Sequence, residues 1–319
     1  MVDVAGIFLG AVGPTVAIAA VGYVLGTARD VDPQSLNTAV VYVLAPALVF
    51  HSLAGSTLAG STLQWLALAV VAFTLAMWGV AEVTGRLFGE REPILSALVL
   101  VAMFTNSGNL GIPVSDFAFG DVGRQTAVVF LSVQSVLMYT VGVYAASRSG
   151  GSAGLVGVRR VFRLPLVYAV VAALAARALG IVPPATSTSM ETLRLVGDAS
   201  IPVMLLVLGI QIARTDTGAA VSRTWPATVL KLGVAPLVGL AVALVVPFGD
   251  ATVARVFVLE AAMPAAVTPV ILVGEFAAGA RSEGVSVPEY VSTCVLVTTL
   301  LGIPVLTGLI AVLRSGVVL

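Results

Sequence analysis

Charged residues are scarce in this chain. Only 10% of its 319 residues are charged, whereas 59% are hydrophobic. Soluble domains carry about 25% charged residues, so this composition indicates a protein that is solvated by lipid. The formal net charge is zero, which gives no indication of nucleic acid as a partner.

Two chemically versatile residue types are almost missing. The chain has one cysteine, Cys294, and one histidine, His51. A single cysteine excludes a disulfide framework, and a single histidine argues against a zinc site or a catalytic triad. The sequence also has no GxxxxGK[ST] phosphate loop, so we expect no nucleotide to drive its activity. We therefore expect no enzyme, no bound metal and no cofactor.

Long apolar runs dominate the chain instead. A transmembrane helix needs roughly 20 mainly apolar residues, and ten segments meet this requirement. They are 5–26, 35–55, 63–85, 92–119, 123–147, 163–181, 192–213, 223–247, 251–279 and 288–313. The sequence thus predicts an all-α polytopic membrane protein with ten transmembrane helices.

The distribution of arginine predicts the orientation. Loops after odd-numbered segments hold ten arginines, and the loops on the other side hold five. Positive residues gather on the cytoplasmic side, so both termini are expected outside the cell membrane. The short loop 148–162 is then cytoplasmic.

An odd number of helices precedes that loop, so the second five helices run inverted. Residues 1–147 and 163–319 would form two inverted repeats, a common design of secondary transporters. Two pairs of prolines recur at one offset: Pro46 with Pro202, and Pro113 with Pro269.

The fourth segment contains residues that interrupt a helix. Residues 106–113 read Asn-Ser-Gly-Asn-Leu-Gly-Ile-Pro. Glycine and proline continue a helix poorly, and unwound backbone at membrane depth must face protein or a wet cavity. We expect a half-helix to restart near Ile112–Pro113, with its positive N-terminal end suited to a carboxylate. Asn106 and Asn109 would add neutral polar contacts. The alternative is a proline-kinked helix whose asparagines bond to neighbouring helices.

The ninth segment repeats the interruption. Pro264 and Pro269 cannot both lie in one undisturbed helix, and this break could cross the first at mid-membrane. Glu260 lies one turn before Pro264, where an ionisable group costs at least ~2.5 kcal/mol. It is a candidate for coupling to protons or cations. Alternatively, its carboxylate reaches water through an extracellular cavity.

Other polar residues lie within the apolar segments. Gln134 and Tyr139 in the fifth segment could face the crossing. Asp198 and Lys231 are further coupling candidates, and could pair with each other. Lys231 could instead extend its side chain to the cytoplasmic surface.

Taken in order, the motifs of this chain form a recognisable set. They are Asn37-x8-Pro46 with Phe50-His51, Asn106-x4-Gly111-Ile112-Pro113, Gln134-x4-Tyr139, Asp198-Ala199, Lys231-x4-Pro236, Ala261-Ala262-Met263-Pro264-x4-Pro269, Glu275-Phe276, Ser292-Thr293 and Pro304. Over essentially the whole chain, this set resembles the auxin efflux carrier family, which comprises the plant carriers of the PIN type and their prokaryotic relatives.

The resemblance implies a homodimeric transporter of weak organic acids or other carboxylates. Helices 1, 2, 6 and 7 would form a scaffold, and helices 3–5 and 8–10 would form a transport domain that moves like an elevator. The substrate would lie where helices 4 and 9 cross. The predicted substrate site comprises Asn106, Ser107, Gly108, Asn109, Gly111, Pro113, Gln134, Tyr139, Pro264, Thr268 and Pro269.

The chain departs from the family pattern in three places. It lacks the long hydrophilic central loop of the plant carriers, and Val49 stands where those carriers have serine. Glu260 replaces a glutamine of the family, and a carboxylate can bind H⁺ or Na⁺ whereas glutamine cannot titrate. A sodium-coupled symporter or a cation/proton antiporter that uses Glu260 is therefore the alternative function. An intramembrane enzyme would need a nucleophile and a base, and the sequence offers no such set.

Overall fold

The computed structural model describes residues 6, 12–29, 31–150, 165–214, 220–277, 279–282 and 284–319. Within these ranges the chain is mostly helical, with a small antiparallel pair of strands, β1 (Arg281–Ser282) and β2 (Val285–Ser286). The predicted loop 148–162 lies outside the described residues from position 151 onward, as do the starts of the predicted first and sixth segments.

The first half of the chain contains seven of the described α-helices, connected in part by wide π-type turns. The α-helices are α2 (Gly13–Ala28), α3 (Pro33–Ala39), α4 (Ala45–Ala54), α5 (Gly60–Leu87), α6 (Ile94–Met103), α7 (Ile112–Leu137) and α8 (Val143–Gly150). The wide turns are η2 (Val40–Leu44), η3 (Ser107–Gly111) and η4 (Met138–Gly142).

The second half has the same character. Its helices are α10 (Pro165–Ala178), α11 (Thr188–Asp198), α12 (Ser200–Arg214), α13 (Trp225–Thr228), α14 (Ala235–Val245), α15 (Ala251–Ala261), α16 (Thr268–Phe276) and α17 (Val287–Ser315). A short 3₁₀ turn, η5 (Val221–Arg223), and a wide turn, η6 (Val229–Val234), flank α13.

Six helical stretches of the described chain are long and apolar enough to cross a membrane. They are Pro33–Ala54, Gly60–Leu87, Ser107–Arg148, Thr188–Arg214, Trp225–Val245 and Val287–Ser315. Shorter apolar helices, including α2, α6 and α10, pack among them. The all-α, multi-pass membrane fold that composition predicts agrees with these helices.

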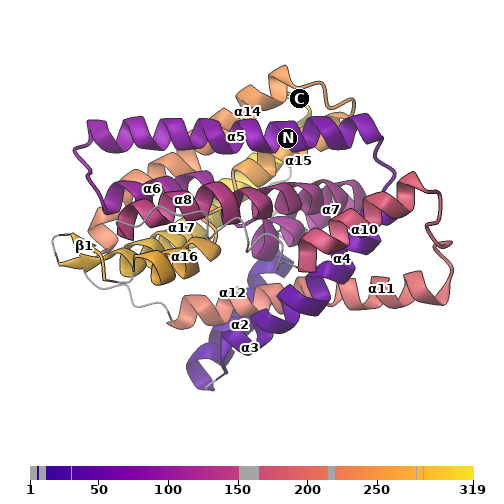
Figure 1. Ribbon diagram of the computed structural model, residues 1–319, viewed down its shortest axis with the longest axis horizontal. Coiled ribbons are helices and arrows are strands. Elements are labelled where there is room, and N and C mark those ends of the chain that lie inside the picture. The colour runs from indigo at the N-terminus through magenta and orange to yellow at the C-terminus, as the bar shows by residue number, and fades with distance from the viewer. Residues whose placement is uncertain are drawn as a thin grey trace.

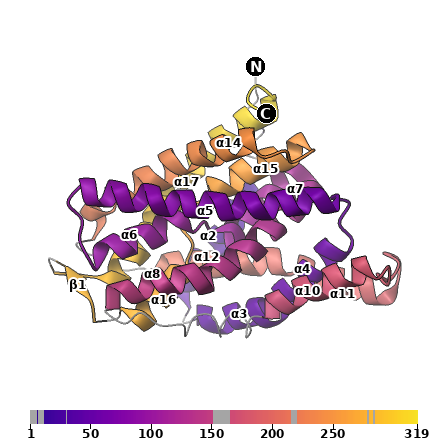
Figure 2. The same ribbon diagram turned by 45° about the horizontal axis from the view of Figure 1, so that its top comes forward.

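The helices pack in two groups. On one side α2 contacts α12, and α4 contacts α10 and α11, while on the other α5 contacts α6 and α7, and α15 contacts α7 and α14. Figure 1 shows α3, α12 and α11 along one edge of the molecule and α5 with α14 along the opposite edge. Figure 2 shows the long α5 across the middle of the view, with α14 and α17 above it and α3, α10 and α11 along the lower edge.

An aromatic cluster forms the centre of the second group. Phe73 of α5, Phe130 of α7 and Phe257 of α15 are fully buried, with ring centroids 5.8 to 6.3 Å apart. Because lipid tails are as apolar as these side chains, close van der Waals packing holds the helices together here.

Two breaks in the helices contact each other. The chain leaves the helical conformation after Met103 and again after Ala261, and Thr105 and Ala265 form an antiparallel bridge. The Asn106 N–H donates to the Pro264 carbonyl at 2.8 Å, and the Ala266 N–H donates to the Phe104 carbonyl at 3.1 Å. Each break therefore satisfies backbone groups of the other, so unwound chain can be buried.

The helical backbone resumes earlier than expected after the first break. The prediction placed the restart near Ile112–Pro113, but the turn η3 already begins at Ser107. Proline has no N–H, and its ring clashes with the carbonyl four residues before it. A wide turn with i to i+5 hydrogen bonds moves this carbonyl away from the ring. The turns η2, η3 and η6 each end just before a helix whose second residue is proline: Pro46, Pro113 and Pro236.

The predicted fourth and fifth segments meet within α7. Gly120 has φ 63° and ψ −149°, a conformation that is essentially restricted to glycine. The chain therefore bends at Gly120 where the sequence predicts a boundary between two segments.

Candidate functional site

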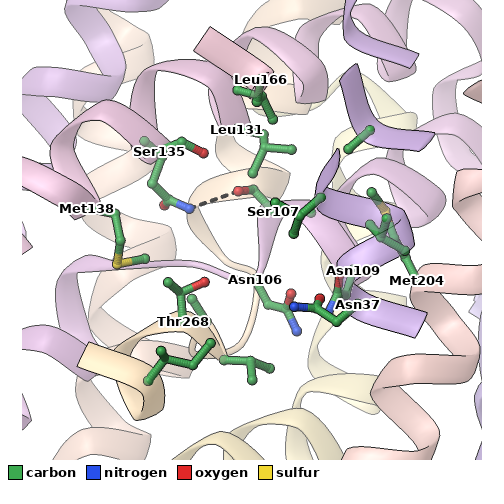
Figure 3. Close-up of a pocket in the computed structure, with 18 of the residues that line it drawn as sticks. Asn37, Asn106, Ser107, Asn109, Leu131, Ser135, Met138, Leu166, Met204 and Thr268 are labelled. Carbon is green, nitrogen blue, oxygen red and sulfur yellow. Dashed lines mark hydrogen bonds between the residues drawn. The ribbon is translucent and has the colours of Figure 1, made fainter. Parts of the chain in front are cut away.

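A cavity of about 180 Å³ lies beside the two paired breaks. Its walls come from both groups of helices. On one side lie α3, η2, the start of α10, and α12. On the other lie the first break with α7 and the second break with α16. The chain has three asparagines, and all three, Asn37, Asn106 and Asn109, line this cavity. Figure 3 shows their amides on the same side of the cavity, away from Met138.

The structure brings together many of the predicted substrate residues. Those that line the cavity are Asn106, Ser107, Gly108, Asn109, Gln134, Tyr139 and Thr268. The other four shape the backbone around it. Pro264 offers its carbonyl to Asn106, Gly111 ends η3, and Pro113 and Pro269 are the second residues of α7 and α16.

Asn106 is the best-placed polar group. Its side chain lines the cavity although the residue is only 4% exposed, and its amide nitrogen has no hydrogen-bond partner among the described residues. Its backbone carbonyl accepts hydrogen bonds from Leu110 and Gly111, and its backbone N–H donates to Pro264. The backbone is thus fixed on both sides, while the amide nitrogen is a buried donor without a partner, which is costly unless a ligand accepts its hydrogen bond.

A helix begins at the wall of the cavity. Asn106 precedes η3, which continues directly into α7, and the first three residues of η3 all line the cavity. The first N–H groups of a helix have no partner within it, and this end carries a partial positive charge. Because the described lining contains no charged side chain, this helix end is its main source of positive potential.

Gln134 braces the first break. Its carbonyl oxygen accepts hydrogen bonds from the Thr105 N–H at 3.0 Å and the Thr105 hydroxyl at 2.9 Å. Its amide donates to the Thr105 carbonyl at 2.7 Å and to the Ser107 hydroxyl at 2.8 Å, the bond dashed in Figure 3. The amide is therefore committed to holding Thr105 and Ser107 in place.

A second cavity, of about 240 Å³, shares lining residues with the first. Asn37, Gln211, Val267 and Ile271 belong to both, and the second extends to Gln34 and Arg214 at the ends of α3 and α12. Asp32 caps α3 beside it, and hydrogen bonds from the N–H of Gln34 and from Ser35 lower the pKa of the Asp32 carboxyl. The two cavities together connect the paired breaks with this end of the helices.

Glu260, the first coupling candidate, is fully buried in the last turn of α15. The Ser115 hydroxyl donates to its Oε1 at 2.7 Å. Its Oε2 has no hydrogen-bond partner within the described part of the chain. The carboxyl group therefore does not extend to an aqueous surface.

Asp198 and Lys231 do not form the predicted pair. Asp198 is partly exposed and instead pairs with Arg124 at 3.0 Å and Arg194 at 3.1 Å. Lys231 is fully buried, so it does not extend to the surface, and its Nζ donates to the Ala102 carbonyl at 3.3 Å. Ala102 lies in the last turn of α6, where the helix dipole favours a cation.

Sequence reasoning missed several neighbours of these groups. Asn37 belonged to a motif but not to the predicted site, and Gln211 and Ser115 were not considered. Ser115 follows Gly111 by one helical turn, so both face α15, a relation that the helical period could have indicated. Gln211 reaches the cavity only because α12 packs against η3, which a single segment does not reveal.

The chain matches the family described as membrane transport protein over residues 7–310. This is the family of the auxin efflux carriers. The chain belongs to it. The resemblance inferred from the motifs is therefore confirmed, and membership makes the chain a membrane transport protein with a small-molecule substrate.

Two relatives are similar to this chain over most of their length. A protein of Methanothermobacter thermautotrophicus called an uncharacterized transporter is 26% identical over 281 residues, which cover 88% of this chain and 89% of the relative. A protein of Rhizobium meliloti with the provisional name of malonate transporter is 26% identical over 330 residues, with 99% of this chain and 98% of the relative covered. The chain is similar to both over nearly its full length.

Proposed function

We propose that this protein is a secondary carrier that moves an organic anion or weak carboxylic acid across the cell membrane. The substrate binds in the cavity beside the paired breaks. The observation that carries the proposal is that Asn106 lines the cavity and that its buried amide nitrogen has no hydrogen-bond partner in the described chain. It lies beside the start of η3, so a carboxylate there would meet an amide donor and a helix N-terminus together.

The electrostatics of the cavity suit a single carboxylate. A helix N-terminus supplies about half an elementary charge, and the amides add dipoles without charge. The apolar part of the lining, which includes Leu131, Met138 and Ile271, would face the rest of the molecule. The provisional name of the Rhizobium meliloti relative also points to a carboxylate.

The proposed mechanism is alternating access by an elevator-like movement in a homodimer. Ten transmembrane helices would form two inverted repeats, with helices 1, 2, 6 and 7 as the scaffold and helices 3–5 and 8–10 as the moving part. In support, both groups of helices contribute walls to the cavity, so a movement of one group against the other would change the side of the membrane from which the cavity can be reached. With both termini outside, the second cavity would lead to the cytoplasm, because Arg214 lies on the arginine-rich side.

A sodium-coupled symporter or cation/proton antiporter is the second candidate function. The observation that favours it is Glu260, a buried carboxyl group next to the turn that forms the cavity. Uptake measured with and without a Na⁺ gradient distinguishes sodium coupling from a sodium-independent carrier.

Transport by the purified protein in liposomes tests the main proposal. Labelled malonate and indole-3-acetate serve as probes, with wild type and Asn106→Ala compared at equal protein density. Loss of a hydrogen bond to a charged group is worth ~1.5–3 kcal/mol, so uptake should fall by at least about tenfold.

Thr74→Val is the matched control, because the buried Thr74 hydroxyl donates to the Val70 carbonyl of its own helix and has no other partner among the described residues. Both variants should melt close to the wild type, which separates loss of transport from loss of fold. Full transport by Asn106→Ala would refute the cavity as the substrate site.

A further inference from the structure

Glu260 is a carboxyl group to which the carrier function assigns no task. It is 0% exposed and receives one hydrogen bond, from Ser115, while Oε2 lacks a partner among the described residues. It forms no ion pair within the described ranges.

The carboxyl group lies directly against the turn η3. A Cβ atom added to Gly111 would lie 2.3 Å from Oε2 and 2.7 Å from Oε1 of Glu260. Gly111 ends η3, and its N–H donates to the carbonyl of Asn106 at 2.9 Å. The same helical turn therefore has the cavity at its start and the Glu260 carboxyl group at its end.

The elements around α15 supply no counter-ion. It packs against η3, α7, α14 and α17, of which η3 and α14 contain no charged residue. The charged groups of α7 and α17 have other partners. In α7, Asp116 and Asp121 pair with Arg124, which also pairs with Asp198. In α17, Glu289 caps the helix and Arg314 donates to the Ala118 carbonyl. Tyr290 and Cys294 of α17 are buried. An ionised carboxylate without a partner in such surroundings is costly, and the group neutralises instead.

We propose that Glu260 binds a proton and that this proton is coupled to the substrate anion in the cavity. The coupling has an electrostatic cause. An ionised Glu260 and a bound carboxylate would both be stabilised by the same positive end of the helix formed by η3 and α7, and the two negative charges would repel each other. A bound anion therefore favours protonated Glu260, and a protonated Glu260 favours the bound anion, as linkage requires.

The proposal rests on the proposed carrier function and adds its driving ion. The proton on Glu260 crosses the membrane together with one monocarboxylate in the cavity, so the transported pair carries no net charge. An inward proton gradient should drive uptake of a monocarboxylate by electroneutral symport.

Infrared spectroscopy of the purified protein tests the proton site without any substrate. A buried protonated carboxyl group gives a carbonyl stretch that an ionised carboxylate lacks. The band should be present in the wild type at neutral pH, absent in Glu260→Gln, and retained in Asp116→Asn, which alters a neighbouring, partly exposed carboxyl group. A wild-type spectrum that Glu260→Gln leaves unchanged would overturn the proposal.

Uptake of indole-3-acetate, a monocarboxylate, into liposomes tests the coupling. A proton gradient should stimulate the wild type, and in Glu260→Gln the ratio of uptake with and without the gradient should fall to unity. Glutamine has nearly the same shape, and Glu260→Asp, which restores a titratable group, should recover part of the stimulation. Stimulation retained by Glu260→Gln, or a requirement for Na⁺ that this variant loses, would overturn proton coupling.

The two proposals fail in different ways. A wild type that transports neither probe but shows the Glu260-dependent band would overturn the carboxylate carrier and the coupling, and would support the proton site. Transport of a probe by a wild type that lacks the band would support the carrier and overturn the proton site.

Discussion

Gly111 is the residue at which the cavity turn meets the buried carboxyl group of Glu260. Its backbone is in the ordinary right-handed helical region, which suits alanine. An added Cβ, however, would lie 2.3 Å from Glu260 Oε2. We therefore expect Gly111→Ala to lower the free energy of unfolding by ~1–3 kcal/mol, the usual range for an overpacked core. Thermal unfolding in detergent measures the change.

Another glycine of the same wide turn, η3, offers a matched control. A Cβ at Gly108 would meet Leu131 at 3.6 Å, an ordinary contact, so Gly108→Ala should be tolerated. Removing the carboxyl group should relieve the clash, so Gly111→Ala combined with Glu260→Ala should be more stable than the sum of the single changes predicts. Additive single changes would show that the carboxyl group does not lie against Gly111.

The individual residues of the site were predictable to different extents. Asn106 and Glu260 are conspicuous in the sequence, because polar and ionisable groups within apolar segments are costly. Their partners were not, because Ser115 approaches Glu260 only when α7 packs against α15. The suggested pairing of Asp198 with Lys231 was wrong for the same reason, since the arginine partner Arg124 comes from a distant segment.

At the scale of helices, α17 holds the second break in place. The Ala265 N–H donates to the Thr298 hydroxyl at 3.2 Å, and both residues are fully buried. Thr298→Val keeps the shape of the side chain but leaves this N–H without an acceptor. An unsatisfied buried donor costs ~1–3 kcal/mol, so the variant should unfold at a lower temperature and transport more slowly.

The same substitution elsewhere in α17 separates this bond from the loss of a hydroxyl group. The Thr307 hydroxyl donates to the carbonyl of Ile303 in its own helix and accepts no hydrogen bond that the structure shows. Thr307→Val should therefore have little effect on stability. Equal effects of the two changes would show that the bond to Ala265 does not support the break.

The breaks themselves could be predicted, but their structure could not. Gly108, Gly111 and Pro113 mark the first break, and Pro264 with Pro269 marks the second, because these residues continue a helix poorly. The early restart at Ser107 depends on a wide turn that no residue type encodes. The pairing of the two breaks needs residues some 160 positions apart in the chain, so it is a property of tertiary packing.

For the molecule as a whole, composition predicts more than local pattern does. A chain with 10% charged residues and long apolar runs has few choices besides a helical membrane fold, because lipid offers no hydrogen-bond partners to the backbone. Which helices contact each other is not encoded in hydrophobicity, since every segment is apolar. The packing of α2 against α12 and of α7 against α15 emerges only in the structure.

Arg124 connects the two groups of helices. It belongs to α7, and it pairs at 3.0 Å with Asp198 of α11, which the proposed mechanism assigns to the scaffold. An elevator movement of α7 past α11 must break this pair. Both side chains are partly exposed, so the pair contributes at most about 1 kcal/mol.

Arg124→Gln and Asp198→Asn should therefore each raise the rate of transport by up to about fivefold. Each change removes the Arg124–Asp198 ion pair, which stabilises the conformation that the structure shows and must break before the movement. The double variant should be no faster than the single ones, and the effect should shrink at high salt. Arg86→Gln is the control, since it breaks an ion pair with Glu82 inside α5 and should leave the rate unchanged. If Arg124 and Asp198 act independently, or not at all, α7 does not move past α11 during transport, and the division of the molecule into a scaffold and a moving part must be drawn elsewhere.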